Sequence, residues 1–166
     1  MTIKVGDRLP DGQLQEFIEV ETAGCSIGPN TFNVADLVKG KKIVVFGLPG
    51  AYTPTCSARH LPSYVEKAAE LKGKGVDEIV ATSVNDAFVL GAWNRDQGSE
   101  EITMLADGNG EFAEALGLTM DASKFGMGKR SQRYSMVIND GVVEQLNVEA
   151  PGEYSASSAE TMLGQL

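Results

Sequence analysis

The sequence predicts a single α/β domain with a mixed central sheet flanked by helices. Two short apolar runs without alternation, at residues 41–47 and 78–84, have the composition of strands buried on both faces. Each run is followed by a segment with helical spacing, and this order indicates parallel strands joined by right-handed crossovers. The segment 134–148 predicts two further strands about a tight Asp140-Gly141 turn, which adds an antiparallel hairpin to the sheet.

The length and composition indicate a soluble globular protein. A chain of 166 residues can bury a sufficient core without disulfides or metal ions, so we expect one domain over residues 1–166. No segment approaches the roughly 20 apolar residues of a membrane helix, and the N-terminus has no apolar signal region. We therefore expect a cytoplasmic protein without membrane contact. The net charge of −9 opposes binding to a phosphate backbone, so no nucleic-acid partner is expected.

The residues before position 41 are typical of strands at the edge of a sheet. Apolar and polar side chains alternate from Leu14 to Val20, and the segment from Gly24 to Asn30 has the composition of a turn. The run from Lys41 to Gly47 then predicts a central strand, because it is rich in β-branched residues and lacks alternation.

Helices alternate with strands in the middle of the chain. One amphipathic helix is indicated by apolar residues at helical spacing, and basic residues and glycines at 72–75 mark its end. Its apolar positions are Leu61, Tyr64, Val65, Ala68 and Leu71. The run from Glu78 to Val84 predicts a second buried strand. Asn85-Asp86 then predicts the cap of a helix that runs through Trp93.

The rest of the chain completes the sheet. A short strand from Ile102 to Leu105 precedes a helix around Glu111 to Leu116, and the hairpin at 134–148 is followed by a last short helix with serine caps. Parallel strands joined by helices, followed by an antiparallel hairpin and a helix, are the layout of a thioredoxin-like α/β domain.

The strongest candidate for chemistry is Cys56, at the start of the first predicted helix. Thr53 is a suitable N-cap and Pro54 fits the first helical position, so the thiol falls within the first turn. Unpaired backbone N–H groups and the positive end of the helix dipole favour a thiolate there, and we predict a nucleophilic sulfur. A buried, inert thiol is the alternative, because free cysteine is among the most buried residue types.

His60 and Cys25 are the other residues that could take part in chemistry at Cys56. His60, the only histidine, follows Cys56 by four residues, and we favour a packing or orienting role over a catalytic Cys–His pair because such side chains project in parallel. No metal site is expected, because only Cys25 adds a thiolate and a zinc site normally needs four ligands. The two cysteines are too few for a disulfide framework, although they remain able to pair with each other.

The loop before the cysteine and one distant arginine complete the candidate site. Pro49 and Gly50 are expected to bend the backbone so that N–H groups face the sulfur and bind a peroxide or an oxyanion. These residues do not form a nucleotide site, because the Walker pattern is absent. Arg133 directly precedes the predicted strand at 134, where its guanidinium would stabilise a thiolate and an anionic leaving group. The alternative for Arg133 is a solvated turn.

Four segments carry a resemblance to a known family. They are P-G-A-Y-T-P-T-C-S from Pro49, H-L-P from His60, S-V-N-D from Ser83 and R-S-Q-R-Y-S-M-V from Arg130. In this order, over nearly the whole chain, they resemble the atypical peroxiredoxins of the peroxiredoxin 5 (type II) group. The resemblance implies a thioredoxin fold and thiol-dependent reduction of hydrogen peroxide and alkyl hydroperoxides, without a cofactor.

The resemblance also implies the roles of individual residues. Cys56 matches the peroxidatic cysteine, whose thiolate attacks the peroxide and becomes a sulfenic acid. Thr53, Pro49 and Arg133 match its active-site partners. Together with Gly50, they are expected to surround the hydroperoxide substrate.

The second half of the catalytic cycle is where this chain departs from many members of the group. Two-cysteine members place a resolving thiol where this chain has Ala81 or Ala156. The resemblance therefore implies recycling by glutathione or a glutaredoxin, or by thioredoxin, with Cys25 as an alternative resolving thiol. It also implies a homodimer packed near the active site.

Two further function classes remain open. The segment T-P-T-C at 53–56 has the form of a C-x-x-C motif with threonine in its first position, as in a monothiol thiol–disulfide oxidoreductase of thioredoxin fold. A non-catalytic binding or holdase protein would also retain the fold, and it predicts that Cys56→Ser leaves function untouched.

Overall fold

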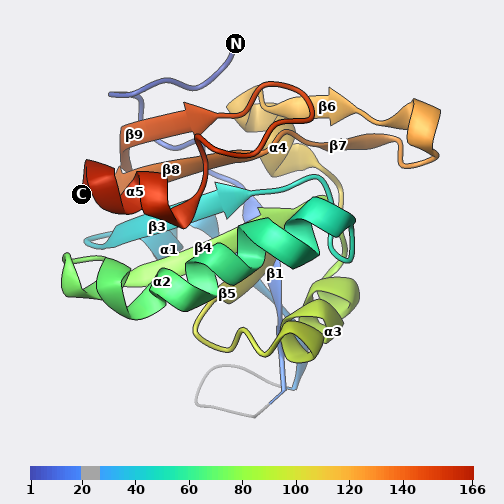
Figure 1. Ribbon diagram of the computed structural model, residues 1–166, viewed down its shortest axis with the longest axis horizontal. Coiled ribbons are helices and arrows are strands. Elements are labelled where there is room, and N and C mark those ends of the chain that lie inside the picture. The colour runs from blue at the N-terminus through green and yellow to red at the C-terminus, as the bar shows by residue number, and fades with distance from the viewer. Residues whose placement is uncertain (20–26) are drawn as a thin grey trace.

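A seven-stranded mixed sheet forms the centre of the computed structural model, which describes residues 1–19 and 27–166 (Figure 1). Its strand order is β2-β1-β5-β4-β3-β8-β9. The parallel strands are β3 (Lys42–Gly47), β4 (Glu78–Ser83) and β5 (Thr103–Ala106). The strands that pair antiparallel are β1 (Gln13–Ile18), β2 (Gly28–Asn33), β8 (Tyr134–Asn139) and β9 (Val142–Val148). The predicted thioredoxin-like fold with a mixed sheet is thus confirmed.

Helices cover both faces of this sheet. One face carries α2 (Leu61–Gly73), which lies in front of the strands in Figure 1, together with α3 (Ala87–Gln97) and α5 (Ala159–Gln165). The other face carries α1 (Val34–Val38) and α4 (Glu111–Leu116). Within the described ranges, none of these helices has the length and hydrophobicity that a membrane span requires.

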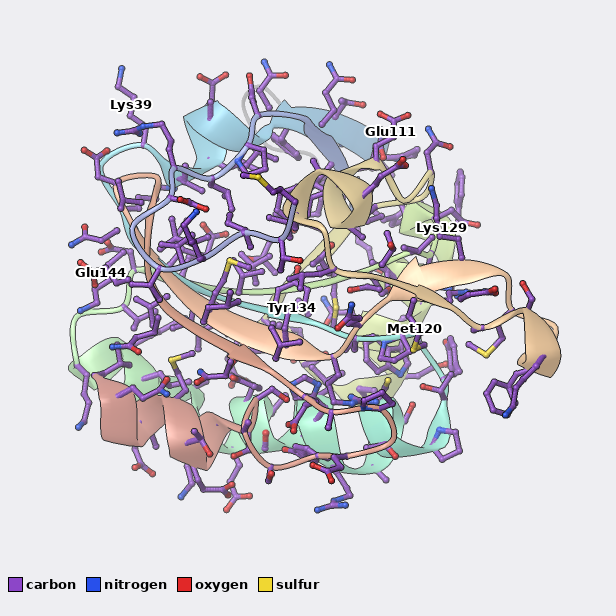
Figure 2. The ribbon with its side chains drawn as sticks, turned by 90° about the horizontal axis from the view of Figure 1, so that it is seen from above. Lys39, Glu111, Met120, Lys129, Tyr134 and Glu144 are labelled. Atoms are coloured by element: carbon purple, nitrogen blue, oxygen red, sulfur yellow. The ribbon has the colours of Figure 1, made fainter. Side chains whose placement is uncertain are left out.

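Strand β3 shows why the sheet is apolar on both sides. Side chains alternate along a strand, so Val44 and Phe46 join the core beneath α2 and α3, whereas Ile43 and Val45 join the core beneath α1 and α4. In Figure 2, Tyr134 lies within the fold, whereas the labelled charged residues lie at its periphery. The uninterrupted apolar run of β3 follows from this double burial.

The antiparallel hairpin is the element that brings a distant segment to the end of β3. Asp140 and Gly141 have φ values of 48° and 84°, as a two-residue hairpin turn requires. Strand β8 runs antiparallel to β3, and Tyr134 pairs with Gly47. A Cβ atom on Gly47 would collide with the ring of Tyr134, so this close approach needs glycine. The pairing places Arg133, just before β8, next to the loop that follows β3.

Four elements differ from the sequence prediction. Strand β2 begins at Gly28, where a turn was predicted, because its backbone pairs with β1 over its whole length. The single-turn α1 and the ribbon of β6 (Thr119–Asp121) and β7 (Lys129–Ser131) were not predicted, since such short elements depend on their partners more than on propensity. The remainder of the predicted turn, 24–26, lies outside the described residues.

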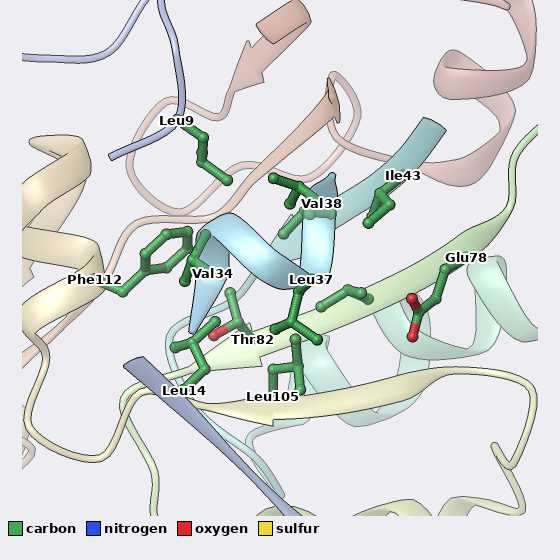
Figure 3. Close-up of a pocket in the computed structure, with 12 residues that line it drawn as sticks. Leu9, Leu14, Val34, Leu37, Val38, Ile43, Glu78, Thr82, Leu105 and Phe112 are labelled. Carbon is green, nitrogen blue, oxygen red and sulfur yellow. The ribbon is translucent and has the colours of Figure 1, made fainter. Parts of the chain in front are cut away.

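A small apolar cavity of about 20 Å³ lies beneath α1 (Figure 3). Val34, Val38 and Phe112 are among its lining residues, and all belong to the core on the α1 and α4 face. The hydroxyl of Thr82 is buried beside the cavity and has no hydrogen-bond partner within the described parts of the chain. Because Cys56 belongs to the core on the opposite face, this cavity is not part of the candidate active site.

Candidate active site

The candidate site lies where β3 ends and a helix begins. Helical structure starts at Pro54, directly after Thr53, which places Cys56 in the first turn as the sequence predicted. The segment Cys56–His60 is wound as a π-helix, in which the Leu61 N–H donates to the Cys56 carbonyl, and it continues into α2. This wide turn was not predicted. Single π turns within α-helices are frequent at functional sites.

Cys56 is completely buried, and one guanidinium reaches its sulfur. Arg133 Nη2 donates to Cys56 Sγ at 3.2 Å, and Arg133 Nη1 donates to His60 Nδ1 at 2.9 Å. A positive charge that donates a hydrogen bond to sulfur stabilises the thiolate more than the thiol. The structure therefore brings Cys56 and Arg133 together, and Arg133 does not lie in a solvated turn.

His60 holds that guanidinium in place. Its Nε2 atom lies 3.1 Å from the Ser157 carbonyl, which can only accept, so Nε2 carries the proton and Nδ1 accepts from Arg133. Burial, and then the charge of Arg133, lower the pKa of His60 to about 3, so the ring is neutral at pH 7. Phe46 packs against the ring with centroids 4.9 Å apart. The geometry fits the orienting interpretation, since both ring nitrogens are paired away from the sulfur.

Thr53 is oriented by the loop that precedes it. Its Oγ1 donates to the Gly50 carbonyl at 2.7 Å, so the hydroxyl oxygen is left as an acceptor for an incoming O–H group. A Cβ atom on Gly50 would lie 3.3 Å from Arg130 Nη1 and 3.4 Å from Thr53 Cγ2, which shows how closely side chains surround this buried glycine. Pro49 is half-buried beside it.

Two N–H groups of the predicted loop bond to acceptors other than the sulfur. The Ala51 N–H donates to Asn85 Oδ1 at 3.0 Å, and the Thr53 N–H points to the Gly50 carbonyl at 3.4 Å. Both bonds fix the shape of the loop instead. The N–H groups of Thr55 and Cys56 lie in the first helical turn, where no intrahelical acceptor is available. These two groups are the better candidates to stabilise an oxyanion.

Several neighbours of the site were not predicted from the sequence. The Ser157 carbonyl comes from the segment 149–158 between β9 and α5, and it also accepts from the Tyr64 hydroxyl at 2.8 Å. Trp93 was named only as part of a predicted helix, yet its Nε1 donates to Ser57 Oγ at 3.0 Å, one residue after the cysteine. No local pattern marks such contacts, because their partners are far apart in the chain.

The remaining sulfur candidates do not add to the site that the structure describes. Cys25 lies outside the described residues. Ala81 is buried in β4 and Ala156 lies in the segment after β9, so neither position supplies a second thiol. Among residues 1–19 and 27–166, no three His, Cys, Asp or Glu side chains gather as metal ligands would.

Comparisons with known proteins agree on one family. The family model described as Redoxin matches residues 4–163. Peroxiredoxin-2E, chloroplastic, of Arabidopsis thaliana is 46% identical over 168 residues, which cover 99% of this chain and 70% of the relative. Reduced Prx3 in complex with H2O2 from Vibrio vulnificus is 49% identical with a TM-score of 0.92, and the match covers 99% of each chain. A Burkholderia cenocepacia structure, whose description names a thioredoxin reductase, is 56% identical with a TM-score of 0.99 over 100% of this chain and 99% of that chain.

Proposed function

We propose that Cys56 is the reacting residue of this chain, which belongs to the peroxiredoxin family and is a thiol-dependent peroxidase. The observation that carries the proposal is the 3.2 Å hydrogen bond from Arg133 Nη2 to Cys56 Sγ, in the first turn of a helix. The Vibrio vulnificus relative is described in complex with H2O2, which supports hydrogen peroxide as a substrate here. Alkyl hydroperoxides carry the same O–O bond and belong to the proposed substrate class.

In the first half of the reaction, the Cys56 thiolate attacks the terminal oxygen of the peroxide. An S–O bond forms as the O–O bond breaks, so the sulfur is oxidised to sulfenic acid and the peroxide is reduced to water or an alcohol. The leaving oxygen takes up a proton. Arg133 stabilises the charge as it moves from sulfur to this oxygen, and Thr53 Oγ1 accepts the O–H of the peroxide.

We further propose that an external thiol completes the cycle. Glutathione or a glutaredoxin is the preferred reductant, with thioredoxin as an alternative, because Ala81 and Ala156 stand where two-cysteine members have resolving thiols. A first thiol condenses with the sulfenic acid to a mixed disulfide and water. A second thiol then releases Cys56 and leaves with a disulfide of the reductant. Since Cys56 is completely buried, we expect its turn to open before the reductant attacks.

Intact mass spectrometry tests both steps on the native chain and on Cys25→Ser and Cys56→Ser. After one equivalent of hydrogen peroxide, the native chain and Cys25→Ser should gain one oxygen atom, and later glutathione should convert it to an adduct at Cys56. Cys56→Ser should gain neither. A Cys25→Ser chain whose Cys56 gains no oxygen would exclude the proposed peroxidase residue, because this variant cannot form a Cys25–Cys56 disulfide. A Cys25–Cys56 disulfide that forms before glutathione is added would overturn only the external reductant.

The rate of that oxidation tests Arg133. Arg133→Gln should slow the reaction of Cys56 with hydrogen peroxide about 100-fold, as does the loss of one group that stabilises transition-state charge. Arg95→Gln is the matched control, because Arg95 is exposed and pairs with Glu19 outside the site. Rapid consumption of peroxide by the native chain would distinguish a peroxidase from a monothiol thiol–disulfide oxidoreductase. Loss of that consumption in Cys56→Ser would distinguish a peroxidase from a non-catalytic holdase.

We also propose a homodimer packed near the active site. Tyr52, in the active-site loop, and Phe88, on α3, have exposed fractions of 51% and 63%. The Tyr52 hydroxyl donates to Asp96 of α3 at 2.7 Å, so the two aromatic side chains border one helix. Sedimentation equilibrium should show a dimer for the native chain and a monomer for Phe88→Asp. A native monomer at micromolar concentration would contradict this assembly.

We propose a cytoplasmic location, because the cycle requires reduced thiols and the cytosol maintains them. Fractionation of cells that express the chain, with the protein detected by antibody, checks this proposal. Recovery of the chain from an oxidising compartment would contradict it.

A further inference from the structure

A buried residue, Glu149, is the first member of a series of hydrogen bonds that holds Arg133. Glu149 directly follows β9, and its backbone N–H donates to the Arg133 carbonyl at 2.9 Å. Its side chain points to the segment 149–158, which supplies the Ser157 carbonyl to His60. One residue therefore touches the main chain of Arg133 and also organises the segment that orients its side chain.

The carboxylate of Glu149 accepts four hydrogen bonds from that segment. Oε2 accepts from Ser155 N at 2.7 Å, from Ser157 N at 2.8 Å and from Ser157 Oγ at 2.6 Å, and Oε1 accepts from Ala156 N at 3.2 Å. Burial acts to raise the pKa of Glu149, but these hydrogen bonds favour the charged form more strongly, and the pKa is lowered. The segment is thus folded around a carboxylate whose exposed fraction is 7%.

The contacts continue from this segment to the sulfur. The Ser157 carbonyl faces His60 Nε2 at 3.1 Å, which fixes the ring so that Nδ1 accepts from Arg133 Nη1 at 2.9 Å. The other terminal nitrogen of Arg133 then reaches Cys56 Sγ at 3.2 Å. Because the Glu149 N–H holds the other end of Arg133, the hydrogen bonds close into a ring through both the backbone and the side chain of the arginine.

We propose that Glu149 is a positioning residue for the peroxidase reaction, because its carboxylate fixes the Arg133 guanidinium against Cys56 without contacting the substrate. This inference depends on the function proposed above for Cys56 and Arg133. Without the carboxylate, the Ser157 carbonyl loses its fixed place and His60 loses the partner that sets its tautomer. The guanidinium then occupies several positions, and a misplacement of about 1 Å can cost about 100-fold in rate.

Two substitutions at Glu149 measure this contribution. Glu149→Gln keeps the shape but turns one acceptor oxygen into a donor, whereas Glu149→Ala removes all four acceptor contacts. The second-order rate of Cys56 oxidation by hydrogen peroxide should fall about tenfold in Glu149→Gln and about 100-fold in Glu149→Ala. The fluorescence of Trp93, which bonds to Ser57, reports the reaction in a stopped-flow instrument. Glu153→Gln, an exposed residue of the same segment, is the matched control and should keep the native rate.

A double-mutant cycle separates positioning from general destabilisation. If Glu149 acts through Arg133, then Glu149→Gln should have almost no further effect on the oxidation rate in an Arg133→Gln chain. If the fold-decreases in oxidation rate of the two single variants multiply in the double variant, the proposal is overturned. A native oxidation rate in Glu149→Gln would also overturn it. If Arg133→Gln alone keeps the native rate, the proposed role of Arg133 fails as well. Glu149→Gln is nearly isosteric, so the cycle remains decisive even where Glu149→Ala does not fold.

Discussion

Lowering the pH from 7 to 5 should destabilise this protein through His60. Burial and the charge of Arg133 lower the pKa of His60 to about 3 in the folded chain, whereas histidine in an unfolded chain keeps its ordinary pKa of about 6.5. The unfolded chain therefore binds the proton first. The contribution of the neutral ring to stability is complete above pH 6.5 and is lost progressively as the pH falls toward 3.

The size of the effect follows from the gap between the two pKa values. Each pH unit within that gap lowers the free energy of unfolding by about 1.4 kcal/mol. A change from pH 7 to pH 5 crosses about 1.5 pH units of the gap, so the expected loss is about 2 kcal/mol. This is a large share of the 5–15 kcal/mol that is roughly typical of a folded domain.

Urea unfolding at the two pH values measures this loss in the native chain and in His60→Gln, which has no group that titrates in this range. The variant should be less stable than the native chain at pH 7, because it loses a hydrogen bond to Arg133 or to Ser157. Its loss between pH 7 and pH 5 should be smaller by about 2 kcal/mol, since the carboxylates contribute to both chains alike. Equal losses in the two chains would refute the reasoning.

Substitutions at three positions test other parts of the structure. Thr53→Val should slow the oxidation of Cys56 about 100-fold, whereas Thr53→Ser should retain most of the rate. The reason is that only the hydroxyl bonds to Gly50 and accepts from the peroxide. Equal oxidation rates for the two variants in stopped-flow would exclude that role. Thr82→Val should raise the free energy of unfolding by about 1 kcal/mol, because it removes a buried hydroxyl that has no partner in the described chain. A lower urea midpoint for this variant than for the native chain would contradict the prediction. Gly47→Ala should lower the free energy of unfolding by about 3 kcal/mol, because the new methyl group would collide with the Tyr134 ring. If this variant is as stable as the native chain, the ring moves aside without cost and the prediction is wrong.

The order of helices and strands, and the place of the cysteine within it, could be predicted from local patterns. The buried runs of β3 and β4, the Asp140-Gly141 turn and the Thr53-Pro54 helix start each depend on residues close together in the chain. The resemblance of four segments, which begin at Pro49, His60, Ser83 and Arg130, to peroxiredoxins led to the family that the comparisons show. Even the approach of Arg133 to the site could be anticipated, because it directly precedes the strand that pairs with β3.

Tertiary structure alone decided how the site is built around the sulfur. The π-helical turn at Cys56, the acceptor role of Thr53 and the paired nitrogens of His60 have no local signature. His60 is separated from Arg133 by 73 residues and from Ser157 by 97, so only the folded sheet brings them into contact. Local propensity acts over a few residues, whereas these hydrogen bonds form only after the strands have paired and the cores on both faces have excluded water.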